Sequence, residues 1–97
     1  MKGGWVYLLA NRYRGTIDTG VSANLAQRAW QHREGKGSEF AKRYDVTRLV
    51  HAEEFPTIYE AIAREKAIKK WRREWKIELI EHENPEWLDR YDELIGI

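Results

Sequence analysis

The chain has 97 residues, of which 42% are apolar and 34% charged, with a formal net charge of +1 at pH 7. This length predicts a single domain, residues 1–97, with a small hydrophobic core. The absence of cysteine excludes disulfides and thiolate metal sites and fits a cytoplasmic location. No apolar run approaches the roughly 18 residues of a membrane span, and nothing at the N-terminus resembles a signal peptide, so we expect no membrane partner.

The N-terminal third is predicted to form two strands and a helix. Residues 5–10 are bulky and apolar on both faces, as in a buried strand. Residues 16–21 alternate in polarity after a polar loop, so the two segments are expected to form a β-hairpin. Asn24 is a favourable N-cap and Gln27 follows three residues later, which predicts a helix that ends before Gly35.

The middle of the chain is predicted to be a loop, a strand and a helix. Residues 35–45 read as a loop, part of which forms one helical turn, and residues 47–55 as a third strand. Thr57 and Glu60 have the spacing of a capping box, so a helix begins there and continues to about Trp71.

The C-terminal part is predicted to be helical. Residues 73–81 continue the preceding helix or follow it after a kink, and Asn84 with Pro85 has the pattern of an N-cap and a first helical position. The order of elements predicts an α+β fold, with a small three-stranded, mostly antiparallel sheet flanked by helices.

The basic residues are concentrated in the middle of the chain. Residues 36–48 and 64–76 are rich in Lys and Arg, whereas the chain from Glu78 onward is mainly acidic. A basic band of this kind attracts a polyanion such as nucleic acid. A solvent-exposed helix face explains the same charges equally well.

Polar residues interrupt the apolar face of the first predicted helix. Arg28 and His32 share that face with Leu25 and Ala29 at helical spacing. An unpaired buried charge is costly, so Arg28 either extends to the rim of the core or pairs with a carboxylate, or it points into a phosphate-binding cleft. The helix pattern alone favours the rim. A lone histidine such as His32 is more often structural than catalytic.

A carboxylate interrupts the second predicted helix in the same way. Glu65 lies on the face that also holds Ile58, Ala61, Ile62 and Ile68. It either pairs with Lys69 four residues on or binds a metal ion, because one carboxylate together with water and phosphate can be enough to hold Mg²⁺.

Tyr7 and two histidines also need an interpretation. Tyr7 lies in the middle of the first strand, where it either packs in the sheet or places its hydroxyl near a reacting water as a general base. His51 and His82 show no partner pattern, and we interpret both as structural or surface residues.

These residues form an ordered set along nearly the whole chain. The set comprises Trp5-Val6-Tyr7, Asp18-Thr19-Gly20, Arg28, His32, and a helix of residues 61–69 that carries Glu65. The set resembles the GIY-YIG nuclease superfamily, in its small single-domain bacterial branch. The resemblance implies an endonuclease that hydrolyses phosphodiester bonds of DNA with Mg²⁺ or Mn²⁺.

The resemblance also implies a role for each residue. Tyr7 would polarise or deprotonate the attacking water, and Arg28 would stabilise the charge that develops on the phosphoryl oxygens. His32 would hydrogen-bond near the reaction centre or assist proton transfer. Glu65 would hold the metal ion, which stabilises the leaving oxygen.

Asp18 departs from the family pattern, which has a tyrosine at this position. An anionic side chain repels a phosphate unless a metal ion or Arg28 compensates for its charge. We hypothesise three outcomes: the activity is weakened or lost, Asp18 serves as an additional metal ligand or base, or the change is harmless because Tyr7 does the main work.

Two other functions compete with nuclease activity. A catalytically inactive nucleic-acid-binding module would use Lys42, Arg43, Tyr44 and Lys69 for backbone contacts and stacking. An interaction domain would bind an acidic protein partner with its basic helix. A nuclease of this size has little surface for reading sequence, so we expect backbone or structure recognition of DNA, or a protein partner that supplies targeting.

Overall fold

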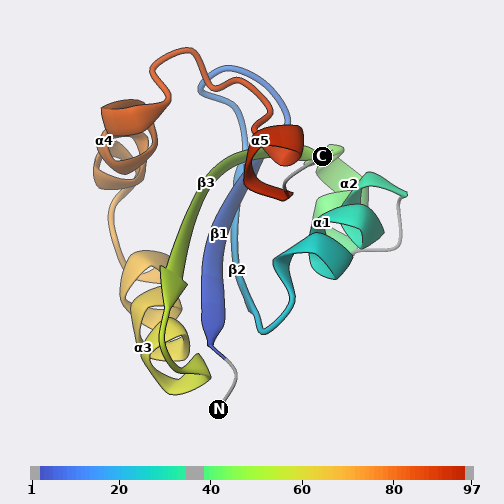
Figure 1. The fold of residues 1–97 in the computed structure, drawn as a ribbon. Coiled ribbons are helices and arrows are strands. Elements are labelled where there is room, and N and C mark those ends of the chain that lie inside the picture. Colours follow the sequence, from blue (N-terminus) through green and yellow to red (C-terminus); the bar gives the residue numbers. More distant parts are fainter. Residues whose placement is uncertain (1–2, 35–38, 96–97) are drawn as a thin grey trace.

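The computed structural model describes residues 3–34 and 39–95. These residues form three strands and five helices (Figure 1). In chain order they are β1 (Gly4–Ala10), β2 (Ile17–Ser22), α1 (Leu25–Arg33), α2 (Glu39–Tyr44), β3 (Arg48–Phe55), α3 (Ile58–Lys69), α4 (Arg73–Glu83) and α5 (Tyr91–Ile95). The predicted α+β fold is confirmed. The predicted loop residues 35–38 lie outside the described part of the chain.

The sheet has the strand order β2-β1-β3, and both pairings are antiparallel. The central strand is buried on both faces, which explains why its sequence is apolar without alternation. A bulge in the pairing with β3 lies between Leu8 and Leu9. Because β2 is at the edge of the sheet, only one side of that strand is covered by a neighbouring strand.

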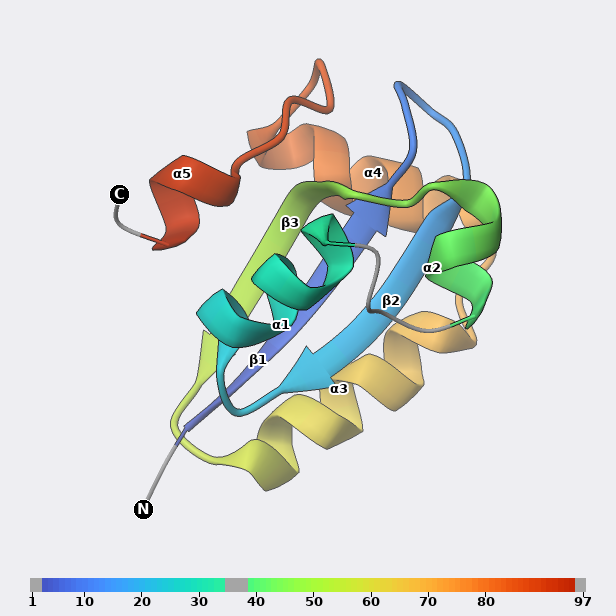
Figure 2. The same ribbon diagram turned by 90° about the vertical axis from the view of Figure 1, so that its right-hand side faces the viewer.

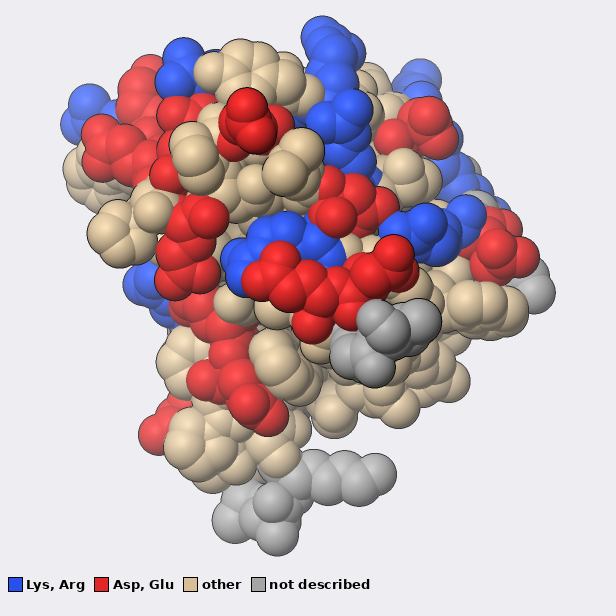
Figure 3. Space-filling view, turned by 45° about the horizontal axis from the view of Figure 1, so that its top comes forward, with Lys and Arg blue, Asp and Glu red and all other residues tan. Residues whose placement is uncertain are grey.

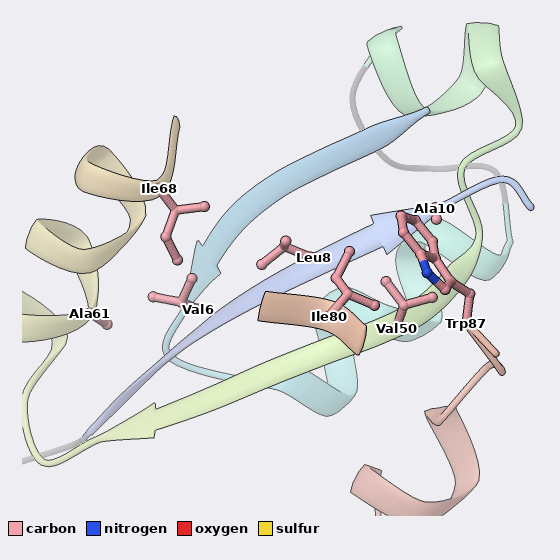
Figure 4. Close-up of a cluster of buried hydrophobic side chains, with 8 residues drawn as sticks. All are labelled: Val6, Leu8, Ala10, Val50, Ala61, Ile68, Ile80 and Trp87. Carbon is pink, nitrogen blue, oxygen red and sulfur yellow. The ribbon is translucent and has the colours of Figure 1, made fainter. Parts of the chain in front are cut away.

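Helices cover both faces of the sheet, with α3 and α4 on one side and α1 and α5 on the other (Figure 2). Alternate residues of β1 supply the two cores. Val6, Leu8 and Ala10 pack with residues of α3 and α4 such as Ile68 and Ile80 (Figure 4). Tyr7 and Leu9 point the other way and pack with Leu25 and Ala29 of α1.

Local sequence signals mark the starts of two helices correctly. The Asn24 side chain accepts a hydrogen bond of 3.1 Å from the Gln27 amide, and Thr57 Oγ1 accepts one of 3.2 Å from the Glu60 amide. The second of these helices ends at Lys69, and α4 begins as a separate helix at Arg73. The single helical turn predicted between residues 35 and 45 is α2.

The predicted helix starting at Asn84 and Pro85 is wrong. Asn84 instead ends α4. Its side-chain nitrogen Nδ2 donates hydrogen bonds to the carbonyl oxygens of Val50 and Leu88, at 3.1 and 2.9 Å. The fully buried Trp87 has a φ of 58°, which is incompatible with a right-handed helix. The last helix therefore begins only at Tyr91. Within residues 3–34 and 39–95, no helix is long and apolar enough to cross a membrane.

Candidate functional site

The hairpin of β1 and β2 provides the floor of the site. Tyr7 pairs with Gly20 across the two strands, and Leu9 pairs with Asp18. Side chains two residues apart in a strand point to the same face. Tyr7, Gly20 and Asp18 therefore all belong to the sheet face that α1 covers.

Gly20 leaves room for the Tyr7 ring. A β-carbon at position 20 would overlap the ring and hydroxyl oxygen of Tyr7. The tyrosine side chain therefore lies across the backbone of β2, toward the edge of the sheet. This close approach explains why a glycine is needed at this point of an otherwise ordinary strand.

Helix α1 brings Arg28 and His32 to this floor. The His32 side chain is buried, and its ring centroid lies 6.0 Å from that of Tyr7 in an edge-to-face arrangement. Arg28 is exposed although it shares a helix face with the buried Leu25 and Ala29. Arg28 is therefore not part of the core, as the helix pattern indicates.

Helix α3 supplies Glu65 from the other layer. This helix packs against β1 and against the edge strand β2, so a side chain that extends past that edge can approach Asp18. The Glu65 side chain is only 12% exposed, and its Oε2 lies 2.8 Å from Nζ of Lys69. The ion pair that the four-residue spacing indicated is thus present.

The pKa values show that these groups act on one another. Burial raises the pKa of Tyr7 to about 12, Arg28 counteracts this increase, and Asp18 and Glu65 add to it. Burial lowers the pKa of His32. The negative charge of Asp18 opposes this decrease, and the positive charge of Arg28 adds to it. The five side chains therefore share one electrostatic environment, although they come from four elements of the fold.

Asp18 is half-buried and is subject to opposing influences. Burial raises its pKa, His32 and Lys69 lower it, and the negative charge of Glu65 raises it further. The charge of Glu65 thus disfavours the ionisation of Asp18, as a like charge in a partly buried site does. A cation placed between them would relieve this repulsion.

The donor set fits a hard divalent cation. Within the part of the chain that the structure describes, no three His, Asp or Glu side chains form a metal cluster by themselves. Mg²⁺ often takes only one or two carboxylates and completes its coordination with water and phosphate oxygens. Glu65, with Asp18 beside it, would be the protein ligand of such an ion.

The residues expected to bind nucleic acid lie in two places. Lys42, Arg43 and Tyr44 are exposed on α2, whereas Lys69 is paired with Glu65. Acidic and basic side chains interleave over the face shown in Figure 3. Attraction of a polyanion would therefore depend on local groups of cations more than on a uniformly basic surface.

Sequence reasoning missed one polar network on the opposite face of the sheet. Nε2 of the buried His51 lies 2.9 Å from Oε2 of Glu53. The Glu53 carboxylate also accepts two hydrogen bonds from Arg64 of α3, one on each oxygen. The interpretation of His51 as a structural residue fits this arrangement. The two-residue spacing of His51 and Glu53 in a strand was the signal that could have indicated a shared face.

Comparison with known proteins gives four consistent matches. Residues 3–78 match the family model described as the GIY-YIG catalytic domain. The chain is 34% identical over 87 residues to a UPF0213 protein of Syntrophus aciditrophicus, covering 89% of this chain and 98% of that relative. It is 35% identical over 66 residues to a UPF0213 protein of Staphylococcus saprophyticus, covering 68% and 80% of the two chains. Its fold resembles the solution NMR structure of a UPF0213 protein from Bacillus halodurans, with a TM-score of 0.56 and 26% identity over 93% of this chain and 95% of that one.

Proposed function

Because this chain belongs to the GIY-YIG catalytic domain family, we propose that it hydrolyses phosphodiester bonds of DNA in a reaction that requires Mg²⁺ or Mn²⁺. The observation that carries the proposal is that Tyr7, Asp18 and His32 share one face of the β1–β2 hairpin, while the charges of Arg28 and of Glu65 on α3 act on the same groups. A general acid or base, a guanidinium and a carboxylate for a metal ion are the groups that this chemistry needs.

Tyr7 is the group best placed to act on the attacking water. Its pKa of about 12 keeps the phenol protonated at neutral pH, so it orients the water by hydrogen bonding. Only the phenolate can accept a proton from the water, and it forms near neutral pH only if nearby positive charge lowers the pKa of Tyr7 so that the phenol first releases its own proton to solvent. Glu65 would hold the divalent cation, which would supply such positive charge and offset the charge of the phosphate oxygens.

Arg28 and His32 would act on the phosphodiester from α1. The exposed guanidinium of Arg28 matches two phosphate oxygens and stabilises the charge that develops on them. Burial keeps His32 neutral at pH 7, since its pKa lies below the ordinary value. A neutral imidazole beside the Tyr7 ring can accept a proton and thus assist proton transfer.

A second function, a catalytically inactive nucleic-acid-binding module, is favoured by one observation. Asp18 stands where the family pattern has a tyrosine, and it adds negative charge beside Glu65. Asp18→Tyr distinguishes the outcomes for this position. A large gain in metal-dependent cleavage means that Asp18 impairs the site, and a loss means that Asp18 serves as a ligand or base.

DNA would be held mainly through its backbone. The exposed Lys42 and Arg43 of α2 would contact phosphates, and Tyr44 would stack on a base. Few residues remain to read sequence, so the choice of substrate would come from DNA structure or from a partner protein.

The test is a cleavage assay with Mg²⁺ and with Mn²⁺ on single-stranded, duplex and branched DNA. The wild type is expected to cleave at least one of these substrates. Glu65→Ala is expected to abolish cleavage while it leaves DNA binding in place. Glu60→Ala, which removes an exposed carboxylate from the same helix, is the matched control and should cleave as the wild type does. Wild-type DNA binding without cleavage under any of these conditions would support the inactive module instead.

A further inference from the structure

Lys69 places an ammonium group on the carboxylate that the proposed function assigns to the metal ion. Its Nζ lies 2.8 Å from Oε2 of Glu65, at the distance of a charge-assisted hydrogen bond. The Glu65 side chain is 12% exposed and that of Lys69 is 55% exposed. The carboxylate is therefore largely shielded from water, and the cation that neutralises it approaches from the solvent side.

The surroundings make this cation more than an ordinary surface partner. Glu65 shares the site with a second carboxylate, Asp18, and with the buried phenol of Tyr7. Lys69 acts favourably on Asp18 as well as on Glu65. The positive group that acts on Tyr7 is Arg28, which belongs to α1 on the other face of the sheet. Lys69 is thus a cation that α3 brings to the two carboxylates.

The ammonium group of Lys69 is also able to move away from Glu65. It is the last residue of α3, and Lys70 follows as the C-cap. A lysine side chain has a flexible four-carbon stem and a strongly hydrated ammonium group. More than half of this side chain is already in water, so a rotation about its stem can release the ammonium to solvent without moving the helix.

We propose that Lys69 is an internal counter-ion that competes with the divalent cation for Glu65. This inference rests on the proposed function, because it takes Glu65 as the protein ligand of the metal ion. In the metal-free protein the ammonium group neutralises the carboxylate and keeps Glu65 paired. Metal binding must displace it, so the apparent metal affinity is lowered by the strength of the ion pair. The displaced ammonium group then remains at the rim of the site, where a phosphodiester would enter.

The test measures metal binding directly, without turnover. Mn²⁺ is titrated into the full chain, and free Mn²⁺ is counted from its electron paramagnetic resonance signal. The variants are Lys69→Met, Lys69→Arg and Glu65→Gln. The matched control is Lys66→Met, which removes the same charge from an exposed position of the same helix.

The expected result distinguishes the effect of the Glu65–Lys69 ion pair from the effect of any positive charge on α3. Lys69→Met should tighten Mn²⁺ binding by about 3- to 10-fold, as expected for loss of a competing ion pair of modest strength. Lys66→Met should change the affinity less than about 2-fold, because its charge acts only through screened solvent. Lys69→Arg keeps a cation in place and should bind Mn²⁺ no more tightly than the wild type.

Thermal unfolding gives a second readout. Without metal, Lys69→Met should have a lower Tm than the wild type, because a largely buried carboxylate has lost its partner. With saturating Mn²⁺ its Tm should rise by more than that of the wild type, since at a given concentration the stabilisation by the ion increases with the logarithm of its affinity.

The outcomes distinguish this inference from the proposed function. If the wild type binds Mn²⁺, Glu65→Gln abolishes binding, and Lys69→Met leaves the affinity unchanged or weaker, Lys69 does not compete and only the inference is overturned. Equal tightening by Lys69→Met and Lys66→Met overturns it too. If neither the wild type nor Lys69→Met binds Mn²⁺, the metal-dependent function fails and the inference fails with it.

Discussion

The ring of Tyr7 lies across Gly20, its cross-strand partner, in the space that a β-carbon at position 20 would occupy. A side chain of one strand thus depends on the absence of a side chain in the next. The arrangement directs the phenol toward the edge of the sheet where α1 and α3 bring in Arg28, His32 and Glu65. The smallest residue of the hairpin therefore controls the position of the residue proposed to act on water.

Gly20→Ala is expected to displace the Tyr7 ring. The added methyl group must push the ring aside, which should cost about 1–3 kcal/mol in the free energy of unfolding. A displacement of about 1 Å should lower cleavage by about 100-fold. Urea unfolding and the cleavage assay measure the two effects. The control is a double-mutant cycle: with Tyr7→Ala in place, Gly20→Ala should lose most of its cost in stability. A cost that persists there would mean that the clash with the ring is not its cause.

Asp18→Asn is expected to stabilise the protein at neutral pH. Burial, opposed by His32 and Lys69 and reinforced by Glu65, raises the pKa of Asp18 above the unfolded value of 3.8. The stability that this group contributes is therefore present below the unfolded pKa and is lost as the pH rises through the folded-state pKa.

Asparagine cannot ionise, so the Asp18→Asn protein does not lose stability as the pH rises through the folded-state pKa of Asp18. The free energy of unfolding of Asp18→Asn should exceed that of the wild type at about pH 7, and the difference should narrow toward about pH 4. Urea unfolding across this range is the measurement, with the exposed Asp92→Asn as control. A difference that is constant with pH would show that ionisation of Asp18 is not responsible.

Glu53 should contribute stability that disappears in acid. Although burial alone would raise its pKa, hydrogen bonds from His51 and Arg64 hold that pKa at about 2, below the ordinary value of 4.5. The contribution is present above pH 4.5 and is lost as the pH falls toward the folded-state pKa. Glu53→Gln should lower the free energy of unfolding by about 2 kcal/mol at neutral pH, with a smaller effect in acid. The exposed neighbour Glu54→Gln should change little at any pH, and an equal effect of both variants would contradict this explanation.

Asn84 should be a structural anchor for the C-terminal segment. Its side chain bonds to the carbonyl oxygens of Val50 and Leu88 and accepts from the Leu88 amide at 3.0 Å. Asn84→Ala removes these three bonds, one of them to the buried carbonyl oxygen of Val50, and should cost about 2–4 kcal/mol in the free energy of unfolding. Asn24→Ala, which removes a helix cap, should cost only about 1 kcal/mol. Chemical unfolding of both variants is the measurement, and a reversed order would refute the anchor.

The C-terminal segment shows where reasoning from sequence failed. Asn24 and Asn84 both have the sequence pattern of a helix N-cap, yet only Asn24 is one, whereas Asn84 is the C-cap of α4. The second uses its amide for bonds to β3 and to the following turn, and Trp87 enters the core in a left-handed conformation. A local pattern indicates what a residue can do, whereas the competing tertiary bonds decided what Asn84 does.

By itself, the sequence determined the strands, the capped starts of α1 and α3, and the helix faces on which Arg28 and Glu65 lie, because each of these depends on neighbours a few residues away. The helix spacing also favoured an exposed Arg28 and offered the Glu65–Lys69 pair, whereas tertiary structure alone decided how near the two helix faces come to Tyr7 and how far Glu65 is buried. These depend on the packing of α1 and α3 against opposite faces of one small sheet, next to an edge strand with no further neighbour. Such long-range distances leave no periodic trace in a single sequence.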